Sequence, residues 1–357
     1  MIMQILPLLI DLAFAATVDQ KQVALYTLHN GDITMQVTNF GARVVSLWTP
    51  DRNGTYEDIV LGYPDIESYI NNKGERFLGC VVGRYANRIA NGKFILNGNT
   101  YTLPLNSGGQ TLHGGLKGFD SVVWDVENAD EHEITFSYFS KSGEEGFPGN
   151  VRILMTYSLT ADNEFKITYR ATTDSTTVIN LSHHSYFNLK GEGNGSIENH
   201  ILTLNASDIT PVNGLLIPTG YLMTVENTPF DFREPHVIGE RINGDHEQLK
   251  YGNGYDHNWV IDHKNADSIE VAAIVYEPEN GRVMTVLTDQ PAIQFYSGNY
   301  FAGTVEGKYG KSHKPRESFA LETQKFPDSP NQPHFPTTVL NEGEIYQHTC
   351  IYKFSTK

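Results

Sequence analysis

The chain has 357 residues and a formal net charge of −16, with 39% hydrophobic and 19% charged residues. This balance is typical of a globular protein with a sizeable core, and the acidity disfavours nucleic acid and acidic membrane surfaces as partners. The two cysteines, Cys80 and Cys350, stand far apart in apolar runs. They therefore indicate small core residues and neither a disulfide scaffold nor a cysteine metal site.

Residues 1–16 have features of a signal peptide. Residues 5–10 form a short apolar stretch, and the small residues within 13–16 resemble a cleavage site. No basic residue precedes the stretch and Asp11 interrupts it. We predict a periplasmic or secreted protein, with a cytoplasmic location as the alternative. No later run approaches the ~20 apolar residues that a membrane-spanning helix needs, so a membrane is not an expected partner.

From residue 23 onward the chain breaks into short runs of alternating apolar and polar residues, which predict antiparallel strands. Asn97-Gly98 between two such runs is typical of a type I′ hairpin turn. Helical patterns occur at residues 66–71, which Asp65 can cap, and at 237–242. The clearest strands are 32–39, 44–48, 93–96, 134–138, 151–159 and 165–171. We predict an all-β fold, a large antiparallel β-sandwich formed by one domain over residues 23–357.

Two early motifs carry candidate site residues. Asn87 and Arg88 lie in a glycine-flanked stretch, and their amide and guanidinium groups suit the hydroxyls of a polyol. An ion-paired surface loop is the alternative interpretation of this stretch. His113 precedes Gly114 and Gly115, which permit a tight turn and a close backbone approach to a ligand. A single histidine beside glycines is, however, more often structural.

A histidine doublet lies in residues 180–189, which we interpret as a strand. Side chains alternate between the two faces of a strand, so His183 and His184 cannot both face one site. This argues against a paired-histidine metal centre. One face is predicted to carry His184, Tyr186 and Asn188, and the other His183 and Phe187. The first face would form a polar, aromatic wall suited to a sugar, which selects His184.

Two acidic positions and one amide complete the candidates. Glu322 is set between an Ala-Leu pair and a Thr-Gln pair, so we expect it to be partly desolvated. Desolvation raises the pKa of a carboxylate and makes it a better base at neutral pH. Asp256 opens a second polar and aromatic run, and Gln294 in a strand-like stretch can bridge two hydroxyls. For either acid an ordinary surface carboxylate is the alternative.

The order and combination of these motifs resemble the aldose 1-epimerase (galactose mutarotase) family, from about residue 23 to the C-terminus. The resembling stretches are 83–89, 112–115 with 118–120, 145–149, 180–189, 256–258, 294–299 and 321–331. The resemblance implies a single β-supersandwich whose open cleft binds a monosaccharide. It implies interconversion of the α and β anomers of a free aldose such as galactose or glucose, without a metal or organic cofactor.

The resemblance also implies roles for individual residues. Glu322 is similar to the family's general base and His184 to its general acid, while His113 and Asp256 resemble the residues that hold and polarise the sugar. The positions that look like hydroxyl-binding ones are Asn87, Arg88, Ser185, Tyr186 and Gln294. The histidine doublet departs from the family pattern of one histidine before Ser-Tyr, and the match at Ser185 and Tyr186 favours His184.

Three alternative functions remain open at this point. A hexose-phosphate 1-epimerase would use the same scaffold, although the acidic composition disfavours it. A glycosidase would pair Asp256 with Glu322, but it also needs an acid on the glycosidic oxygen and a water or nucleophile opposite. A non-catalytic sugar-binding protein would have no reason to hold His184 and Glu322 together. The joint presence of these two residues therefore favours the epimerase.

Overall fold

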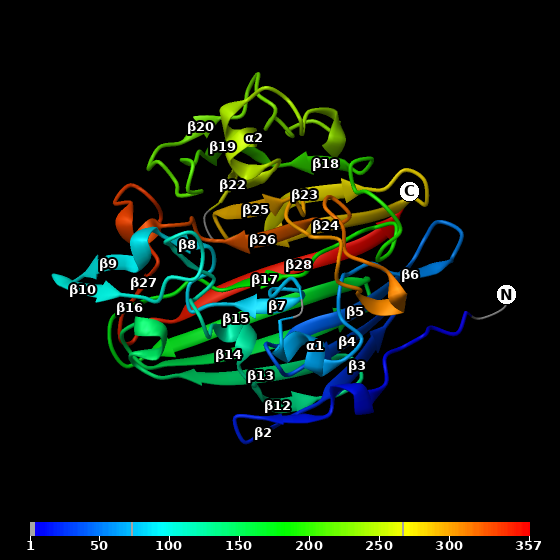
Figure 1. Cartoon of the computed structure of the whole chain (residues 1–357), viewed down its shortest axis with the longest axis horizontal. Helices are drawn as coiled ribbons and strands as arrows, with labels where there is room; N and C mark the ends of the chain where they lie inside the picture. Colours follow the sequence, from blue (N-terminus) through cyan, green and yellow to red (C-terminus); the bar gives the residue numbers. More distant parts are fainter. Residues whose placement is uncertain (1–3, 73, 266–267) are drawn as a thin grey trace.

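The computed structural model describes residues 4–72, 74–265 and 268–357, and it confirms an all-β, antiparallel sandwich (Figure 1). The largest element is a nine-stranded sheet in which every neighbouring pair is antiparallel. In spatial order its strands are β12 (Asp125–Ala129), β13 (Glu133–Ser140), β14 (Val151–Thr160), β15 (Glu164–Thr173), β28 (Tyr346–Thr356), β24 (Arg282–Thr288), β23 (Glu270–Tyr276), β18 (Ile201–Leu204) and β21 (His236–Val237).

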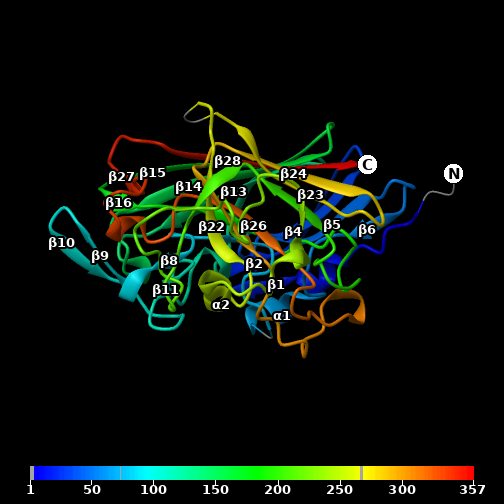
Figure 2. The same cartoon turned by 90° about the horizontal axis from the view of Figure 1, so that it is seen from above.

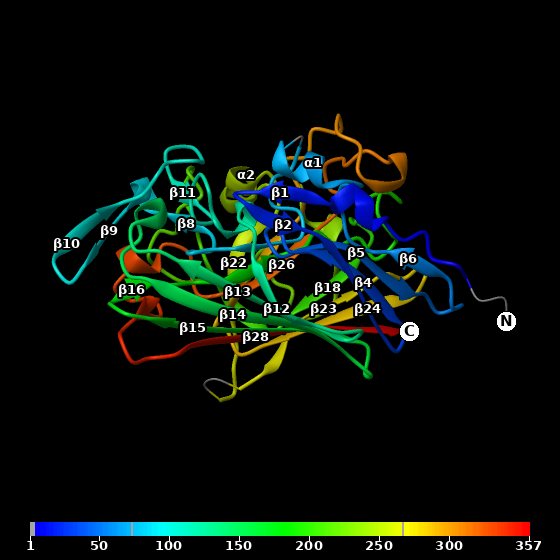
Figure 3. The same cartoon turned by 90° about the horizontal axis from the view of Figure 1, so that it is seen from below.

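A second layer covers one face of the nine-stranded sheet (Figures 2 and 3). It contains a five-stranded and a four-stranded sheet. The first runs β20 (Met223–Thr224), β19 (Ala206–Thr210), β22 (Asp256–Ile261), β25 (Ala292–Tyr296) and β26 (Ala320–Gln324). The second runs β3 (Leu25–Asn30), β4 (Ile33–Thr38), β5 (Arg43–Pro50) and β6 (Tyr56–Asp58).

Period-two alternation explains the layering. In β14 the side chains of Ile153, Met155 and Tyr157 are buried, whereas the intervening Leu154 is 45% exposed. The buried face packs into one core with side chains of both second-layer sheets. Met35 comes from the four-stranded sheet, and other side chains come from β22, β25 and β26 of the five-stranded sheet. Hydrophobic burial of this continuous core is the main stabilising contribution to the fold.

Between the two second-layer sheets lies the short pair β7 (Cys80–Val82) and β17 (Ser182–His184), with β17 beside β26 (Figure 1). Each residue of β7, β17, β25 and β26 is buried. These strands therefore have no solvated face, because one side packs on the core and the other carries a second set of buried groups. That second set contains the candidate site.

Small elements complete the chain. The remaining strands are β1 (Ala16–Val18), β2 (Lys21–Val23), β8 (Arg88–Ile89), β9 (Lys93–Leu96), β10 (Asn99–Thr102), β11 (Thr111–Leu112), β16 (Thr177–Val178) and β27 (Val339–Leu340), and the helices are α1 (Ile66–Ile70) and α2 (Glu247–Gly252). Short 3-10 turns lie at Asp11–Phe14, Ala90–Gly92, Phe119–Ser121, Glu144–Gly146, Ile238–Glu240, Lys308–Gly310 and Ser329–Asn331. No helix in the described ranges is long and apolar enough to cross a membrane.

The predicted strands are confirmed within a few residues, as is the hairpin, where Asn97 and Gly98 have φ of 51° and 78°. The helix predicted at residues 66–71 is α1, and the Asp65 carboxylate accepts the Ser68 N–H as its cap. The helix predicted at 237–242 is wrong. Residues 236–237 pair with β18 as strand β21, and Arg241 has φ of −125°, so only one 3-10 turn fits between them. Both cysteines are free and buried, as predicted.

Candidate active site

The histidine doublet divides between the two faces of β17. On the core side, His183 Nδ1 lies 3.2 Å from the Tyr157 hydroxyl of the nine-stranded sheet. His184 points the opposite way, as strand alternation predicts. Its Nε2 lies 3.4 Å from Glu322 Oε1, and both side chains are at most 4% exposed.

Glu322 reaches this position by the same alternation on β26. Its neighbours Leu321 and Thr323 face the core, where the Thr323 hydroxyl is 2.8 Å from His348 Nε2 of β28. The carboxylate therefore projects away from the nine-stranded sheet. Its Oε2 is buried without a protein hydrogen-bond partner among the described residues, and so is His184 Nδ1. A buried polar atom without a protein partner is normally satisfied by a bound water or a ligand, so both atoms can accept a group of a substrate.

His113 and Asn87 hold each other in place beside this pair. The Asn87 N–H donates to His113 Nδ1 (3.0 Å), and the His113 N–H donates to the Asn87 carbonyl (3.1 Å). Because Nδ1 accepts a hydrogen bond, neutral His113 carries its hydrogen on Nε2. The His113 and His184 rings lie 5.0 Å apart and nearly perpendicular. His113 thus supplies a hydrogen-bond donor to the site.

Gly114, the residue after His113, is required by close packing within the protein. Gly114 has φ of 92°, and a Cβ there would lie 1.9 Å from the Gly83 carbonyl oxygen. A Cβ on Gly115 would likewise meet the Glu145 carboxylate at 2.4 Å. We predicted that these glycines allow a close approach to a ligand. The structure corrects this, because the close approach is between two segments of the protein.

Three further predicted residues form a polar group on the neighbouring strands. Gln294 Nε2 donates to Asp256 Oδ1 (2.8 Å), and an Arg88 guanidinium nitrogen lies 3.7 Å from Asp256 Oδ2. Gln294 pairs directly with Glu322 across β25 and β26. The three strands β8, β22 and β25 thus place a guanidinium, a carboxylate and an amide next to the His184–Glu322 pair, a set suited to sugar hydroxyls.

Residues 185–189 depart from the predicted strand. β17 ends at His184, and Ser185 Oγ is 2.6 Å from His183 Nε2, which holds this hydroxyl on the core side. The prediction that Ser185 binds substrate is therefore not supported by its position, because alternation places residue 185 opposite His184. Tyr186 returns to the site, with its ring 4.9 Å from that of His184. Asn188, predicted on the same wall, instead donates to the carbonyls of residues 195 and 317.

Burial shifts the protonation equilibria of the pair in opposite directions. Desolvation lowers the pKa of His184 to about 4 and raises that of Glu322 well above its usual range. Asp256 raises the Glu322 pKa further, whereas Arg88 lowers it. Burial also lowers the pKa of His113 well below its usual value, and the charge of His184 adds to this effect. Burial thus removes the preference for the proton on the histidine that an exposed pair would have, and each residue is favoured in its neutral form.

Two residues of the site were missed by sequence reasoning. The Phe77 ring lies 4.7 Å from that of His113 and 5.9 Å from that of His184. Glu75, two residues earlier, accepts the Phe77 N–H at Oε1 (3.0 Å). Both lie in a short connection before β7, whose polar composition indicates only a surface loop. A contact made through tertiary folding leaves no local pattern that would identify them.

Three site residues also have the composition of a metal-binding group. One ligand atom from each of His113, His184 and Glu322 lies within 4.8 Å of the others. While His113 Nδ1 accepts the Asn87 N–H, however, its Nε2 carries a hydrogen and is not available as a ligand. The observed hydrogen bonds thus fit an organic substrate better than a metal ion at this nitrogen.

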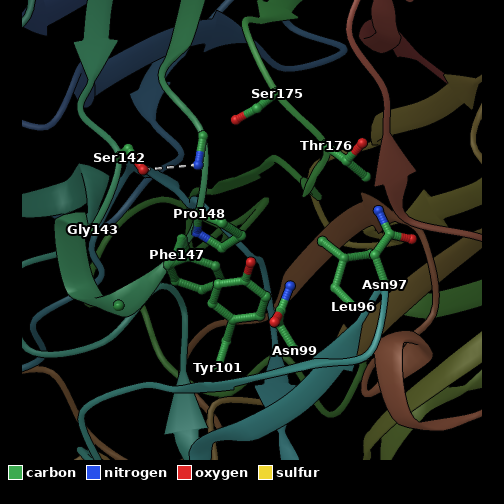
Figure 4. A pocket seen from close by; sticks show the side chains of 12 residues that line it. Leu96, Asn97, Asn99, Tyr101, Ser142, Gly143, Phe147, Pro148, Ser175 and Thr176 are labelled. Atoms are coloured by element: carbon green, nitrogen blue, oxygen red, sulfur yellow. Dashed lines mark hydrogen bonds between the residues drawn. The ribbon is translucent and has the colours of Figure 1, made fainter.

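A separate cavity of ≈ 470 Å³ lies between the β9–β10 hairpin and residues 142–149 (Figure 4). Tyr101 and Phe147 line it beside several amides and hydroxyls, and Ser142 Oγ accepts the Gly149 N–H (3.1 Å). Its lining residues include no carboxylate or histidine, and none is a predicted site residue. This cavity therefore offers no carboxylate or imidazole for acid and base chemistry.

Comparisons of the whole chain with known proteins give concordant matches. The sequence profile of the family described as aldose 1-epimerase matches residues 24–353. A galactose mutarotase from Bos taurus is 40% identical over 333 residues, which are 93% of this chain and 94% of the relative. An aldose 1-epimerase from Escherichia coli (strain K12) is 37% identical over 339 residues, with 94% and 96% covered. The solved structure of an aldose epimerase homologue from C. elegans has a TM-score of 0.84 at 29% identity and covers 94% of this chain and 99% of its own.

Proposed function

The chain belongs to the aldose 1-epimerase family, an isomerase family that acts on carbohydrates, and we propose that it interconverts the α and β anomers of free aldoses such as D-galactose and D-glucose. One observation carries the proposal: His184 Nε2 and Glu322 Oε1 lie 3.4 Å apart, both nearly fully buried. Anomer exchange needs one base and one acid at neighbouring oxygens of the same sugar, and this pair supplies both.

The reaction moves two protons and breaks one bond. Glu322 removes the proton from the C1 hydroxyl while His184 donates its Nε2 proton to the ring oxygen, and the bond between C1 and the ring oxygen breaks. The aldehyde turns about the C1–C2 bond and presents its other face. His184 then takes back the proton from the C5 hydroxyl as its oxygen attacks C1, and Glu322 returns the other proton to the new C1 hydroxyl. The enzyme ends in the state in which it began.

The opposite pKa shifts suit this exchange. Between them the two residues share one exchangeable proton, which must be on His184 when ring opening begins and is on Glu322 after it. An exposed pair would strongly favour the proton on the histidine, because its pKa is about two units higher. Burial lowers the pKa of His184 to about 4 and raises that of Glu322. Moving the proton to Glu322 through the sugar is therefore no longer opposed.

The surrounding groups hold the sugar by its hydroxyls. Arg88, Asp256 and Gln294 are already joined by their own contacts, so they need little further ordering when they bind. The Nε2–H of His113 is placed to donate to an oxygen next to the reacting centre. Such a preorganised donor stabilises negative charge that develops during ring opening.

Polarimetry of freshly dissolved α-D-galactose and α-D-glucose tests the proposal directly. The wild-type protein should accelerate the approach to anomeric equilibrium, and the His184→Ala variant should lose this acceleration while keeping its fold. Aryl glycosides should release no aglycone, which separates the epimerase from a glycosidase. If the wild type leaves both sugars at their spontaneous rate, the proposed function is wrong.

Export through residues 1–16 stays a prediction. Phe14 within this segment is fully buried and packs beside Tyr69, with ring centroids 6.4 Å apart. Cleavage after Ala16 would thus remove Phe14 from a core cluster, together with Leu9, Ala13 and Ala16, which pack against it. Sequencing the N-terminus of the protein purified from its native cells tests the prediction. A terminus at Thr17 supports export, and retention of residues 4–16 contradicts it.

A further inference from the structure

We propose that Gln324 is a positioning residue, which orients the Gln294 side chain so that one amide N–H of Gln294 is left for a sugar hydroxyl. The inference rests on the proposed function, because it concerns how the same site holds its substrate. Gln324 is the last residue of β26, two residues after Glu322, and it is fully buried. Its side chain donates only to two other amides, so its effect on the reaction has to pass through a neighbour.

The register of β22, β25 and β26 puts the side chains involved on one face (Figure 1). Asn258 pairs with Gln294, and Gln294 pairs with Glu322, so these three side chains lie in one row across the strands. Gln324 is two residues beyond Glu322 and therefore lies on the same face, in the next row. Its partner on β25 is Ala292, whose small side chain leaves room for the Gln324 amide to reach across β25.

The amide nitrogen of Gln324 joins two neighbours. Its Nε2 donates to Asn258 Oδ1 (2.9 Å) and to Gln294 Oε1 (3.4 Å). An amide NH2 group carries two hydrogens, and these two contacts use both of them. The reversed orientation of Gln324 would place its oxygen against Gln294 Oε1, which brings two acceptors together. Gln324 therefore acts on Gln294 as a hydrogen-bond donor.

Asp256 and Gln324 together select one orientation of the Gln294 amide. Gln294 Nε2 donates to Asp256 Oδ1 (2.8 Å), and its Oε1 accepts from Gln324. If this amide were reversed, its oxygen would face a carboxylate oxygen and its nitrogen would face another N–H group, so both contacts would become repulsive. In the observed orientation Nε2 has one hydrogen left, which can donate to a sugar hydroxyl. A donor that is already held in place needs little further ordering when the sugar binds.

Without the Gln324 donor, only Asp256 would hold the Gln294 amide. Loss of one neutral hydrogen bond shifts an equilibrium between two orientations by about twofold to tenfold. The apparent affinity for the sugar falls in proportion to the fraction of molecules whose amide keeps the binding orientation. We therefore expect KM to rise by about threefold to tenfold. The value of kcat should change by less than twofold, because Gln324 donates to neither His184 nor Glu322.

A double-mutant cycle in the full-length enzyme tests this role. KM and kcat for D-galactose anomer exchange are measured in wild type, Gln324→Met, Gln294→Met and the double variant. Methionine has nearly the length of glutamine but donates no hydrogen bond. A residue that acts through Gln294 should raise KM in the wild-type background, and by less than twofold where Gln294 is already replaced. A residue that only stabilises the site as a whole would raise KM equally in both backgrounds.

Gln36→Met is the matched control. Gln36 is also a buried amide, at 1% exposed, and its hydrogen-bond partners are Leu9, Thr27 and Ser46, none of which belongs to the site. Its variant should keep the wild-type KM. Because KM does not depend on how much of a preparation is folded, partial loss of stability in any variant leaves the comparison valid.

Gln324→Glu is a second variant, and it keeps the shape of the side chain. The introduced carboxyl group donates one hydrogen bond when it is protonated and none when it is ionised. KM of this variant relative to wild type should therefore rise with pH. A KM within twofold of wild type in Gln324→Met, or an equal rise of KM in both backgrounds of the cycle, would overturn the inference. Failure of the wild type to exchange the anomers of D-galactose would instead overturn the proposed function.

Discussion

Replacing Glu322 with Gln isolates the proposed base. The amide has nearly the volume of the carboxylate, so the packing around this 2% exposed residue is preserved, but it accepts no proton. General base catalysis contributes about 10² to 10⁴ in rate, so kcat should fall by that factor, equivalent to about 3 to 5 kcal/mol of barrier. KM should change little, because Arg88, Asp256 and Gln294 remain. Stability should be retained or rise, because the variant no longer buries an ionisable group whose pKa burial raises.

Polarimetry with the spontaneous rate subtracted measures the loss, and urea unfolding measures the stability. Glu342→Gln, at an exposed position, removes the same charge without touching the site and should behave as wild type. A folded Glu322→Gln variant that keeps more than a tenth of wild-type kcat would refute the assignment of Glu322 as the base. A variant that is much less stable than wild type would instead show that the ionised carboxylate contributes to folding.

Three further predictions follow from burial and from backbone geometry. The pH profile of kcat should be bell-shaped. On the acid side, activity falls near the His184 pKa of about 4, where the pair gains a second proton. On the alkaline side, activity falls at the raised pKa of Glu322, where the pair loses its shared proton. A flat profile down to pH 3 in folded protein would contradict this prediction. The free energy of unfolding should fall as pH drops from about 6.5 to 4, because the unfolded chain binds protons that the buried histidines of the folded protein do not. The loss is at most about 1.4 kcal/mol per histidine and pH unit. Equal unfolding midpoints at pH 7 and 5 would refute this prediction. The histidines whose pKa burial lowers to about 3 or 4 are His183, His184, His200, His257 and His348. Gly114→Ala should lower the free energy of unfolding by at least about 3 kcal/mol, because its Cβ would overlap the Gly83 carbonyl. Gly98 has φ of 78° and open space around it, so Gly98→Ala should lose only about 1 kcal/mol through backbone strain. Similar losses of unfolding free energy in the two variants would contradict the contact argument.

Local periodicity was sufficient to predict the all-β fold and the separation of His184 from His183. Alternation in the strands of the nine-stranded sheet predicts one buried face, and the structure confirms it. The same alternation separates His183 from His184, because adjacent side chains on a strand cannot share a face. Strand alternation was not applied to Ser185, which is the predicted binding residue that the structure places on the core side. Ser185 was assigned from a motif, although its odd offset from His184 already predicts the core side.

Other features depend on contacts that sequence neighbours do not encode. The segment at residues 236–240 is decided by β18, which pairs with residues 236–237 as a strand and leaves room for only one 3-10 turn after them. Phe77 lies in a polar connection with no periodic pattern, yet tertiary folding brings its ring to both His113 and His184. Propensity and spacing describe what a segment prefers in isolation, so they cannot identify residues whose role comes only from their neighbours in space.

Burial connects the architecture to the chemistry. The pair β7 and β17 lies between two sheets, so His184 has no solvated face, and Glu322 on the adjoining β26 shares this environment. Desolvation disfavours both the imidazolium and the carboxylate, so it lowers the pKa of the histidine and raises that of the glutamate. A surface pair with the same spacing would remain locked as an ion pair and would resist the proton exchange. The second layer of strands therefore does more than complete the core: by burying one face of β17 and β26, it shifts the pKa values of a histidine and a glutamate in the directions that the proposed proton exchange requires.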